Sequence, residues 1–306
     1  MPNPTKRVTV LLATYNGMRW LPDQVESILT QQTVEIRLIV SDDQSSDGTW
    51  EWLQELAIRD PRVTVLPRNE KFGSAARNFY RLILDANTDD CDFVAFSDQD
   101  DIWEAGKLVR HAEIAIQGRF DGVSSSVVAF WENGHSVKID KSKPQREYDF
   151  LFESPGPGCT FLMTPWLVGQ LRGLLSDPNL HAGDVALHDW LAYAVCRAAG
   201  RAWHIDDLPT VRYRQHQANE FGANHGIKAV VSRLGKLSDG WYRQEVIKIV
   251  TISRMLSSDQ KYAQILKLLN HTAWMRRLGL LRYISGSRRR LVDRLALALT
   301  IMLNLF

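Results

Sequence analysis

Three carboxylates lie within four positions of one stretch of the chain: Asp98, Asp100 and Asp101. Like charges this close repel one another, so a protein that keeps them ionised usually supplies a cation. Carboxylate oxygens are the hard ligands that Mg²⁺ and Mn²⁺ prefer, and these ions often take their remaining ligands from substrate phosphates. The stretch therefore predicts a site for a divalent cation and a diphosphate. The alternative is an acidic turn in solvent.

The elements around these carboxylates predict where they lie. They follow the apolar run 93–96, which is typical of a buried strand. Three more strand-like runs end in polar residues: 8–13 before Thr14 and Tyr15, 36–40 before Asp42 and Asp43, and 63–66 before the stretch from Arg68 to Arg77. Segments with helical spacing lie between the strands, and this alternation predicts a doubly wound α/β sheet. Ligands of such sheets bind beyond the carboxyl ends of the strands, so the four polar clusters should meet at one site.

Motifs of other nucleotide-binding classes do not follow these strands. No Gly-x-Gly-x-x-Gly or Walker-type loop follows any of them, which disfavours a dinucleotide dehydrogenase and a P-loop NTPase. The cysteines Cys91, Cys159 and Cys196 are widely spaced and form no metal-binding pair, which favours a reducing compartment. The N-terminus lacks the apolar region of a signal peptide, and no run approaches the roughly 20 apolar residues that span a bilayer. We expect a cytoplasmic protein that is at most peripheral to a membrane.

The charge divides the 306 residues into two parts. Residues 227–306 hold 15 Lys and Arg against 4 Asp and Glu, whereas residues 1–226 hold 22 against 31. Segment 227–306 has helical spacing and ends in Arg288, Arg289 and Arg290 followed by a highly apolar stretch. This pattern favours an interfacial helix on anionic lipid. A helical domain packed on the sheet and a dimer-forming helix are the alternatives, and no recognition motif for nucleic acid accompanies the basic residues.

The first roughly 220 residues resemble the family 2 inverting glycosyltransferases, and more narrowly the bacterial rhamnosyltransferases of cell-surface polysaccharide assembly. Six stretches carry the resemblance in order: Ala13 to Asn16, Ser41 to Thr49, Asn69 to Asn78, Ser97 to Trp103, His188 to Trp190, and Tyr213 to His216. The resemblance implies a GT-A-type nucleotide-sugar-binding sheet with flanking helices over 1–226, with 227–306 added as a C-terminal helical segment.

The resemblance also implies roles for individual residues. Thr14, Tyr15 and Asp43 would bind the base of the nucleotide, Arg77 would approach the diphosphate, and Asp98 would lie toward the ribose or sugar. Asp100 and His216 would ligate Mg²⁺ or Mn²⁺, while Gly158, Arg214 and Gln215 would line the sugar and diphosphate. The residue types agree, since the Tyr15 ring can stack on a base and the Asp43 carboxylate can accept the imide N–H of uracil or thymine. Asp42 is interpreted as a capping or solvated acid. The role of Asp101 is left open, with capping of the next helix as the alternative to a function in the site.

Sugar transfer needs a base for the acceptor hydroxyl, and a carboxylate within hydrogen-bond reach is the natural choice. Asp189 opens a helix-like stretch and matches the family's base position, although an acid at a helix start is also favoured by the helix dipole. His188 precedes it where many relatives have Glu, so His188 either tunes the base or packs. The Gln-x-x-Arg-Trp signature of processive synthases is absent from the second half, which predicts addition of a single sugar.

The prediction is a metal-dependent inverting glycosyltransferase that adds rhamnose from dTDP-rhamnose to a lipid-linked saccharide, as in O-antigen synthesis, beside the inner face of the membrane. A UDP-galactose or UDP-N-acetylglucosamine transferase is the first alternative, because the base contacts do not separate uracil from thymine. A nucleotidyltransferase and a membrane-docked scaffold that binds sugar nucleotides are the others. Donor, acceptor, linkage and oligomeric state stay open.

Overall fold

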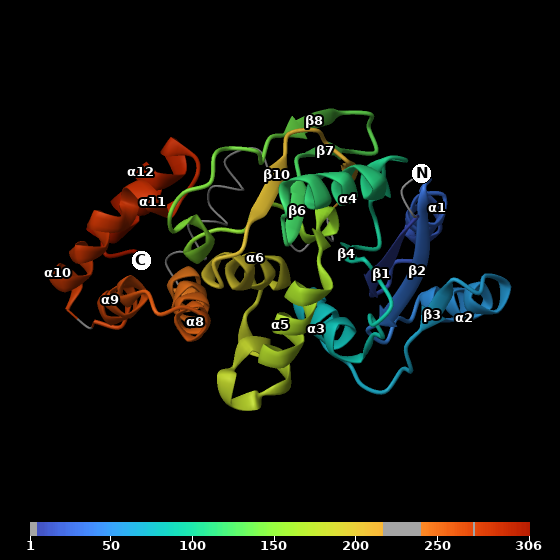
Figure 1. Ribbon diagram of the computed structural model, residues 1–306, viewed down its shortest axis with the longest axis horizontal. Helices are drawn as coiled ribbons and strands as arrows, with labels where there is room; N and C mark the ends of the chain where they lie inside the picture. The colour runs from blue at the N-terminus through green and yellow to red at the C-terminus, as the bar shows by residue number, and fades with distance from the viewer. Residues whose placement is uncertain (1–4, 217–239, 272) are drawn as a thin grey trace.

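The computed structural model describes residues 5–216, 240–271 and 273–306 (Figure 1). Its main sheet has seven strands in the order β10-β6-β9-β4-β1-β2-β3. The strands are β1 (Lys6–Thr14), β2 (Val34–Asp42), β3 (Val63–Val65), β4 (Phe93–Ser97), β6 (Gly122–Ser125), β9 (Leu162–Met163) and β10 (Trp203–Asp206). The pairs β1–β2, β1–β4, β2–β3 and β6–β10 are parallel, which confirms the predicted α/β sheet.

Strand β9 runs antiparallel between β4 and β6, an arrangement that the sequence did not predict. A second, four-stranded sheet, β5-β11-β7-β8, was also not predicted. It consists of β5 (Ile102–Trp103), β7 (Val127–Phe130), β8 (Ser136–Ile139) and β11 (Val211–Arg214). Strand β5 directly follows the acidic loop and pairs with β11, so this small sheet brings residues 211–216 beside Asp98 to Asp101.

Helices cover both faces of the main sheet (Figure 1). They are α1 (Leu21–Leu29), α2 (Thr49–Arg59), α3 (Ala75–Asp85), α4 (Lys107–Gly118), α5 (Pro165–Ser176) and α6 (His188–Ala198). Side chains of β1 alternate between two cores. Val8, Val10 and Leu12 pack in the core formed with α1, α2 and α4, whereas Leu11 and Ala13 pack in the core formed with α3, α5 and α6. This burial on both faces explains why β1 is nearly continuously apolar.

The C-terminal helices extend the core on the α3–α6 side. They are α8 (Trp241–Leu256), α9 (Gln260–Leu269), α10 (Trp274–Arg277), α11 (Ile284–Ser287) and α12 (Leu291–Met302). Val246, Ile249 and Val250 of α8 are fully buried in the same core as α6. The predicted boundary between 226 and 227, and the predicted helical positions Val230, Val231, Leu234 and Leu237, lie outside the described residues. In the described part of the chain, every helix is too short or too polar to cross a bilayer.

Candidate active site

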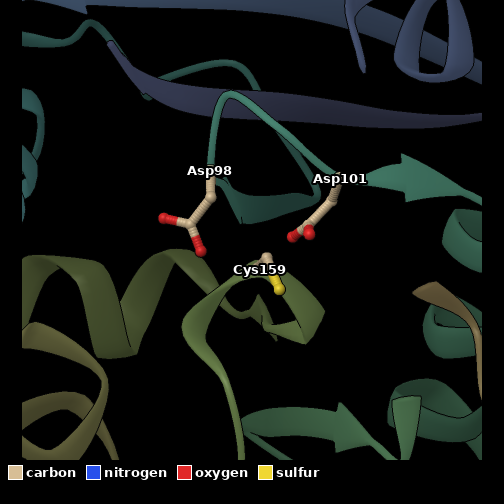
Figure 2. A group of neighbouring side chains, drawn as sticks. All are labelled: Asp98, Asp101 and Cys159. Carbon is tan, nitrogen blue, oxygen red and sulfur yellow. The ribbon is translucent and has the colours of Figure 1, made fainter. Parts of the chain in front are cut away.

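The acidic loop after β4 brings Asp98, Asp101 and Cys159 together (Figure 2). One ligand atom from each residue lies within 4.8 Å of the others. Asp101 is fully buried and its Oδ1 accepts the backbone N–H of Arg214 at 3.0 Å, while Oδ2 has no nitrogen or oxygen donor among the described residues. Burial, and then the negative charges of Asp100 and Asp98, raise the pKa of Asp101 well above its usual value. Capping of the next helix, the alternative for Asp101, is not observed, because its carboxylate holds β11 and the residue before α4 is Gly106.

Asp100 contacts the end of the segment that follows β11. Its Oδ2 lies 2.7 Å from Nε2 of His216, and the His216 ring stacks on Trp20 with centroids 4.0 Å apart. The Arg214 guanidinium donates from Nε to the Asp100 carbonyl at 2.8 Å, and the Gln215 amide donates to the Arg214 carbonyl at 3.0 Å. The structure therefore brings Asp100, Arg214, Gln215 and His216 together, as predicted. Gln215 is buried, which indicates that it supports the segment from within.

The donor atoms of this cluster suit a hard divalent cation. Carboxylates from Asp98, Asp100 and Asp101 and an imidazole from His216 are oxygen and nitrogen ligands of the kind that Mg²⁺ and Mn²⁺ accept. Asp101 Oδ2 is buried without a nitrogen or oxygen donor among the described residues, and the Asp101 carboxylate has only the weak Cys159 thiol beside its backbone bond, so a positive partner would stabilise its ionised form. The residues present therefore fit such an ion.

A buried lysine lies beneath the acidic loop. The Lys107 ammonium is fully buried, lies 3.5 Å from the centroid of the Trp103 ring, and has no hydrogen-bond acceptor among the described residues. Burial lowers its pKa to about 7, against the opposing effects of Cys159 and Asp101. Sequence reasoning missed Lys107, because its position has no local pattern that marks it.

The loop after β1 presents Tyr15 toward solvent. The side chain is 46% exposed, and Nζ of Lys71 lies 5.1 Å from its ring centroid. The Gln99 amide fixes the Tyr15 backbone twice: Tyr15 N–H donates to Oε1 at 2.8 Å, and Nε2 donates to the Tyr15 carbonyl at 2.9 Å. Gly17 allows this approach, since a Cβ there would lie 2.1 Å from Gln99 Oε1. Gln99, which sequence reasoning did not select, thus links the Tyr15 loop to the acidic loop.

The acids after β2 are both buried. Asp42 accepts the Thr14 hydroxyl at 3.1 Å and pairs with Arg68 at 3.2 Å, so its interpretation as a solvated acid was wrong. Its Oδ2 also accepts the Ser45 N–H at 3.0 Å, which is a capping bond to the turn that follows. Asp43 accepts the N–H of Phe72 and, at 2.8 Å, that of Gly73, which fixes the loop before α3. Each oxygen of the Asp43 carboxylate keeps a second lone pair for a ligand, whereas each oxygen of Asp42 already has two donors.

Arg77 and Thr14 differ in their access to a ligand. Arg77 is exposed in the first turn of α3, where the Ser74 hydroxyl accepts its N–H at 3.3 Å. Thr14 is buried, and its hydroxyl is already bonded to Asp42. The geometry leaves Arg77 and the Tyr15 ring open to a nucleotide, and a role of Thr14 in binding stays a prediction.

Asp189 lies in the first turn of α6. Oδ1 accepts the N–H of Trp190 at 2.7 Å, and Oδ2 accepts the Ser154 hydroxyl at 3.0 Å. The side chain is only partly exposed, and burial raises its pKa to about 6, although the hydrogen bonds from Trp190 and Ser154 act in the opposite direction. A carboxylate with such a pKa can accept a proton near neutral pH.

Two residues fix the position of Asp189 relative to the acidic loop. The His188 ring stacks on Phe79 with centroids 3.9 Å apart, and burial lowers its pKa to about 3, so it packs as a neutral ring. A Cβ on Gly158 would lie 2.6 Å from His188 Nε2 and 3.4 Å from the Asp189 Cβ. His188 and Asp189 thus approach the Gly158 backbone closely, as the choice of glycine predicted. The next residue, Cys159, belongs to the Asp98–Asp101 cluster, so Asp189 and the acidic loop flank one short turn.

A surface hollow of about 410 Å³ lies at the opposite edge of the sheet, near Lys6, Phe93 and Arg201. It contains none of the predicted site residues. We assign the site from the converging side chains at the carboxyl ends of β1, β2 and β4, where the chemistry of the residues is concentrated.

Residues 9–165 match the family model described as glycosyl transferase family 2. The chain is 38% identical over 239 residues, 78% of its length and 83% of the relative, to the dTDP-rhamnosyl transferase RfbG of Shigella flexneri. It is 28% identical, over 60% of its length and 68% of the relative, to the UDP-Glc:alpha-D-GlcNAc-diphosphoundecaprenol beta-1,3-glucosyltransferase WfgD of Escherichia coli.

Two solved structures share the fold. The chain superposes on TarS 1-349 of S. aureus in complex with UDP-GlcNAc with a TM-score of 0.58 and 16% identity, over 92% of this chain and 73% of that one. It superposes on the mannosyltransferase PcManGT of Pyrobaculum calidifontis, in complex with GDP-Man and Mn2+, with a TM-score of 0.54 and 17% identity. This superposition covers 100% of this chain and 83% of that one. At these identities the likeness concerns the fold alone, and it confirms the predicted GT-A-like architecture.

Proposed function

The chain belongs to glycosyl transferase family 2, and from that premise we propose that it is a metal-dependent inverting transferase. It adds one sugar, rhamnose from dTDP-rhamnose, to a lipid-linked saccharide in the synthesis of O-antigen or a similar cell-surface polysaccharide. The choice of donor is supported by the 38% identity to a relative named as a dTDP-rhamnosyl transferase. The lipid-linked acceptor is supported by the name of the glucosyltransferase relative, which specifies a diphosphoundecaprenol.

The observation that carries the chemistry is the shared turn at Gly158 and Cys159. Asp189 lies beside Gly158, and Asp98 and Asp101 lie beside Cys159, the next residue. In the proposal, a sugar bound over this turn has the Asp189 carboxylate on one face and the diphosphate site on the opposite face. That arrangement suits a single displacement at the anomeric carbon, which inverts its configuration.

In the proposed reaction, Asp189 accepts the proton of the acceptor hydroxyl as the oxygen attacks the anomeric carbon. The new glycosidic bond forms as the bond to the diphosphate oxygen breaks, and a nucleoside diphosphate leaves. A divalent ion held by Asp100 and His216, with Asp98 beside it, would supply positive charge to the departing diphosphate. Arg77 is placed to contact the diphosphate, Tyr15 to stack on the base, and Asp43 to accept its imide N–H.

Cellular contacts follow from the same proposal. A lipid-linked acceptor requires the protein to work beside the inner face of a membrane, and the basic C-terminal segment is the part suited to that contact. A homodimer through the same segment is the alternative. Nucleic acid is not proposed as a partner, because no recognition motif accompanies the basic residues.

A donor panel tests the proposed function. The purified chain is incubated with dTDP-rhamnose, UDP-galactose or UDP-N-acetylglucosamine, with Mn²⁺ or with a chelator, and with a lipid-linked acceptor extract. Release of dTDP from dTDP-rhamnose alone, only with metal, is expected. Release of UDP instead selects the UDP-sugar alternative. Formation of dTTP and rhamnose 1-phosphate when pyrophosphate is added to dTDP-rhamnose, without release of dTDP, indicates a nucleotidyltransferase and contradicts the proposal.

A further inference from the structure

Helix α12 presents a continuous apolar face to solvent. Its exposed large apolar residues are Leu291, Val292, Leu295, Leu299 and Met302, with Leu303 directly after the helix, and they are 45% to 68% exposed. At 3.6 residues per turn, these positions lie on one side of the helix, together with exposed Ala296. The opposite side, Leu297, Thr300 and Ile301, is buried against the other C-terminal helices. Every exposed residue of α12 is thus apolar, which is unusual for a helix that faces water.

The apolar face continues onto α10. Nε1 of Trp274 donates to the carbonyl of Ile301 at 3.0 Å, so Trp274 lies against the C-terminal end of α12. Trp274 is 39% exposed and the adjacent Met275 is 73% exposed. Tryptophan is enriched where a protein meets the boundary between lipid head groups and acyl chains. We call these residues of α10 and α12, with Leu303, the α12 face.

In the chain segment that forms most of the α12 face, the exposed charges have one sign. Between residues 277 and 306, the exposed charged side chains are Arg282 and Arg290, and Asp293, the one acid in that range, is partly buried. Arg294 is turned toward the protein, where it donates to the Ser285 carbonyl at 3.1 Å. Exposed arginines beside a wide apolar face complement an anionic lipid surface. A second copy of the chain would bring more arginines to this face and no exposed acid from it.

We propose that the α12 face is the surface by which the protein lies on an anionic lipid bilayer. The leucines enter the boundary between head groups and acyl chains, and Arg282 and Arg290 contact the phosphate groups. This inference deepens the proposed function, since it names the partner of the C-terminal segment. Docking through this face requires neither donor nor acceptor, so its test is independent of the proposed reaction.

Vesicle co-sedimentation of the full chain tests the α12 face. The wild type should sediment with vesicles of phosphatidylcholine mixed with phosphatidylglycerol and not with phosphatidylcholine alone, and added salt should release it. Leu295→Asn with Leu299→Asn should weaken binding about tenfold or more, because two apolar side chains no longer enter the lipid. Arg282→Gln with Arg290→Gln should weaken it by about a factor of five for each charge removed.

The control is Ile58→Asn, an equally apolar side chain that is 86% exposed on α2. This variant should bind vesicles as the wild type does. Binding that is unchanged in the Leu295 and Leu299 variant overturns the proposal. Failure of the wild type to bind, together with a dimer that the same variant dissociates, also overturns it and assigns the face to contacts between copies.

The loop that contains Glu153 and Ser154 lies beside Asp189 and is held by the C-terminal segment. Arg289 is buried: its Nη2 donates to the Ser154 carbonyl at 2.7 Å, and its backbone N–H donates to Glu153 Oε1 at 2.6 Å. The Ser154 hydroxyl oxygen, Oγ, lies 3.0 Å from Asp189 Oδ2 and 2.9 Å from the Gly156 carbonyl oxygen. A hydroxyl has one proton, so it donates either to Asp189 or to Gly156. The C-terminal segment therefore reaches the proposed base through one serine.

We infer that Arg289 is a positioning residue for Asp189, an inference that rests on the proposed function. By fixing the Ser154 backbone, Arg289 keeps the Ser154 hydroxyl on the ionised carboxylate. When Asp189 has taken the acceptor proton, it can donate to Ser154 Oγ, and the serine proton can turn to the Gly156 carbonyl. Among the residues that the structure describes, the other charged or titratable groups around Asp189 are His188, Lys141 and Tyr80.

The test is the pH profile of kcat. Arg289→Gln should lower kcat about tenfold and move the acid limb to higher pH, because a hydrogen bond to the carboxylate is weakened, while KM for the donor stays unchanged. Ser154→Ala should move the limb in the same direction without removing a buried charge, and Arg289→Lys should restore part of the effect. Arg59→Gln, an exposed arginine on α2, is the control.

Two results overturn the positioning role. In the first, the acid limb of the kcat profile lies at the wild-type pH in both Arg289→Gln and Ser154→Ala. In the second, activity falls in proportion to the folded fraction without a shift of the limb. If the wild type itself transfers no sugar, or if Asp189→Asn keeps full turnover, the proposed function has failed instead, so the two failures are distinguishable.

Discussion

Nε2 of His216 lies 2.7 Å from Oδ2 of Asp100, although the two residues are 116 positions apart in the chain. The small sheet makes this contact possible, because β5 and β11 pair and carry the acidic loop and the His216 segment to the same edge. The Trp20 ring stacks on the histidine and limits its rotation. Both side chains are mostly buried: Asp100 is 13% exposed and His216 is 11% exposed. Their contact is therefore fixed by the fold.

Asp100→Asn should remove most of the metal-dependent binding of dTDP. The change keeps the size of the side chain and removes the charge that a divalent cation requires. The shift in melting temperature that Mn²⁺ adds to that of dTDP alone is the measurement. We expect it to disappear in this variant and to persist in Asp90→Asn, an exposed acid away from the site. A full metal-dependent shift in Asp100→Asn contradicts the assignment.

Tyr15→Ala should weaken dTDP binding about tenfold, since stacking of a base on an aromatic ring is worth about 1–3 kcal/mol. The ring is 46% exposed and its backbone is held by Gln99, so truncation should leave the fold intact. Titration calorimetry with dTDP measures the effect. Tyr15→Phe keeps the ring and is the matched control, with affinity near that of the wild type. Equal affinity in the alanine variant shows that the base lies elsewhere.

Gly158→Ala should reduce turnover about 100-fold, because the added methyl group needs space that His188 Nε2 occupies at 2.6 Å. His188 and Asp189 would have to move together, which displaces the proposed base. Gly169→Ala in α5 is the control, since a Cβ there meets nothing within 4 Å. That change should stabilise the protein by about 0.5–1 kcal/mol, as expected for glycine to alanine inside a helix. Normal turnover in Gly158→Ala contradicts the close approach.

The pH dependence of transfer should show an acid limb near pH 6. Burial raises the pKa of Asp189 to about 6, so the carboxylate is ionised and able to accept a proton above that pH. Below it, protonation removes the base and kcat should fall about tenfold for each pH unit. The profile is measured with saturating donor and metal at constant ionic strength. A kcat that stays constant down to pH 4.5, well below the assigned pKa, contradicts the role of Asp189.

The sequence predicted the elements that carry local signals. Strand β4 was found because four apolar residues run directly into carboxylates, and Asp189 was placed at a helix start because helical spacing follows it. Strand β9 and the pairing of the small sheet were missed, since the strands are two to four residues long and, apart from the neighbouring β7 and β8, pair with partners that are distant in sequence. Periodicity cannot show which distant short strands pair.

The residues that the sequence missed have roles that depend on their neighbours in space. Gln99 is an unremarkable amide until the Tyr15 backbone lies opposite it, and Ser154 becomes relevant only because Asp189 does. Lys107 has no local mark of burial, since it lies at the start of an ordinary helix. Asp42 was misjudged for the same reason: its partners Thr14 and Arg68 come from other loops.

Asp189 is the residue proposed to accept the proton of the acceptor hydroxyl. Asp189→Asn keeps the shape of the side chain and the hydrogen bond from Ser154 to an oxygen, so binding of dTDP with Mn²⁺ should match that of the wild type. The decisive measurement is the rate of dTDP release from dTDP-rhamnose in the presence of acceptor. We predict a fall of about 10²–10⁴-fold, the usual contribution of a general base, with binding unchanged. Turnover equal to that of the wild type would contradict the central claim.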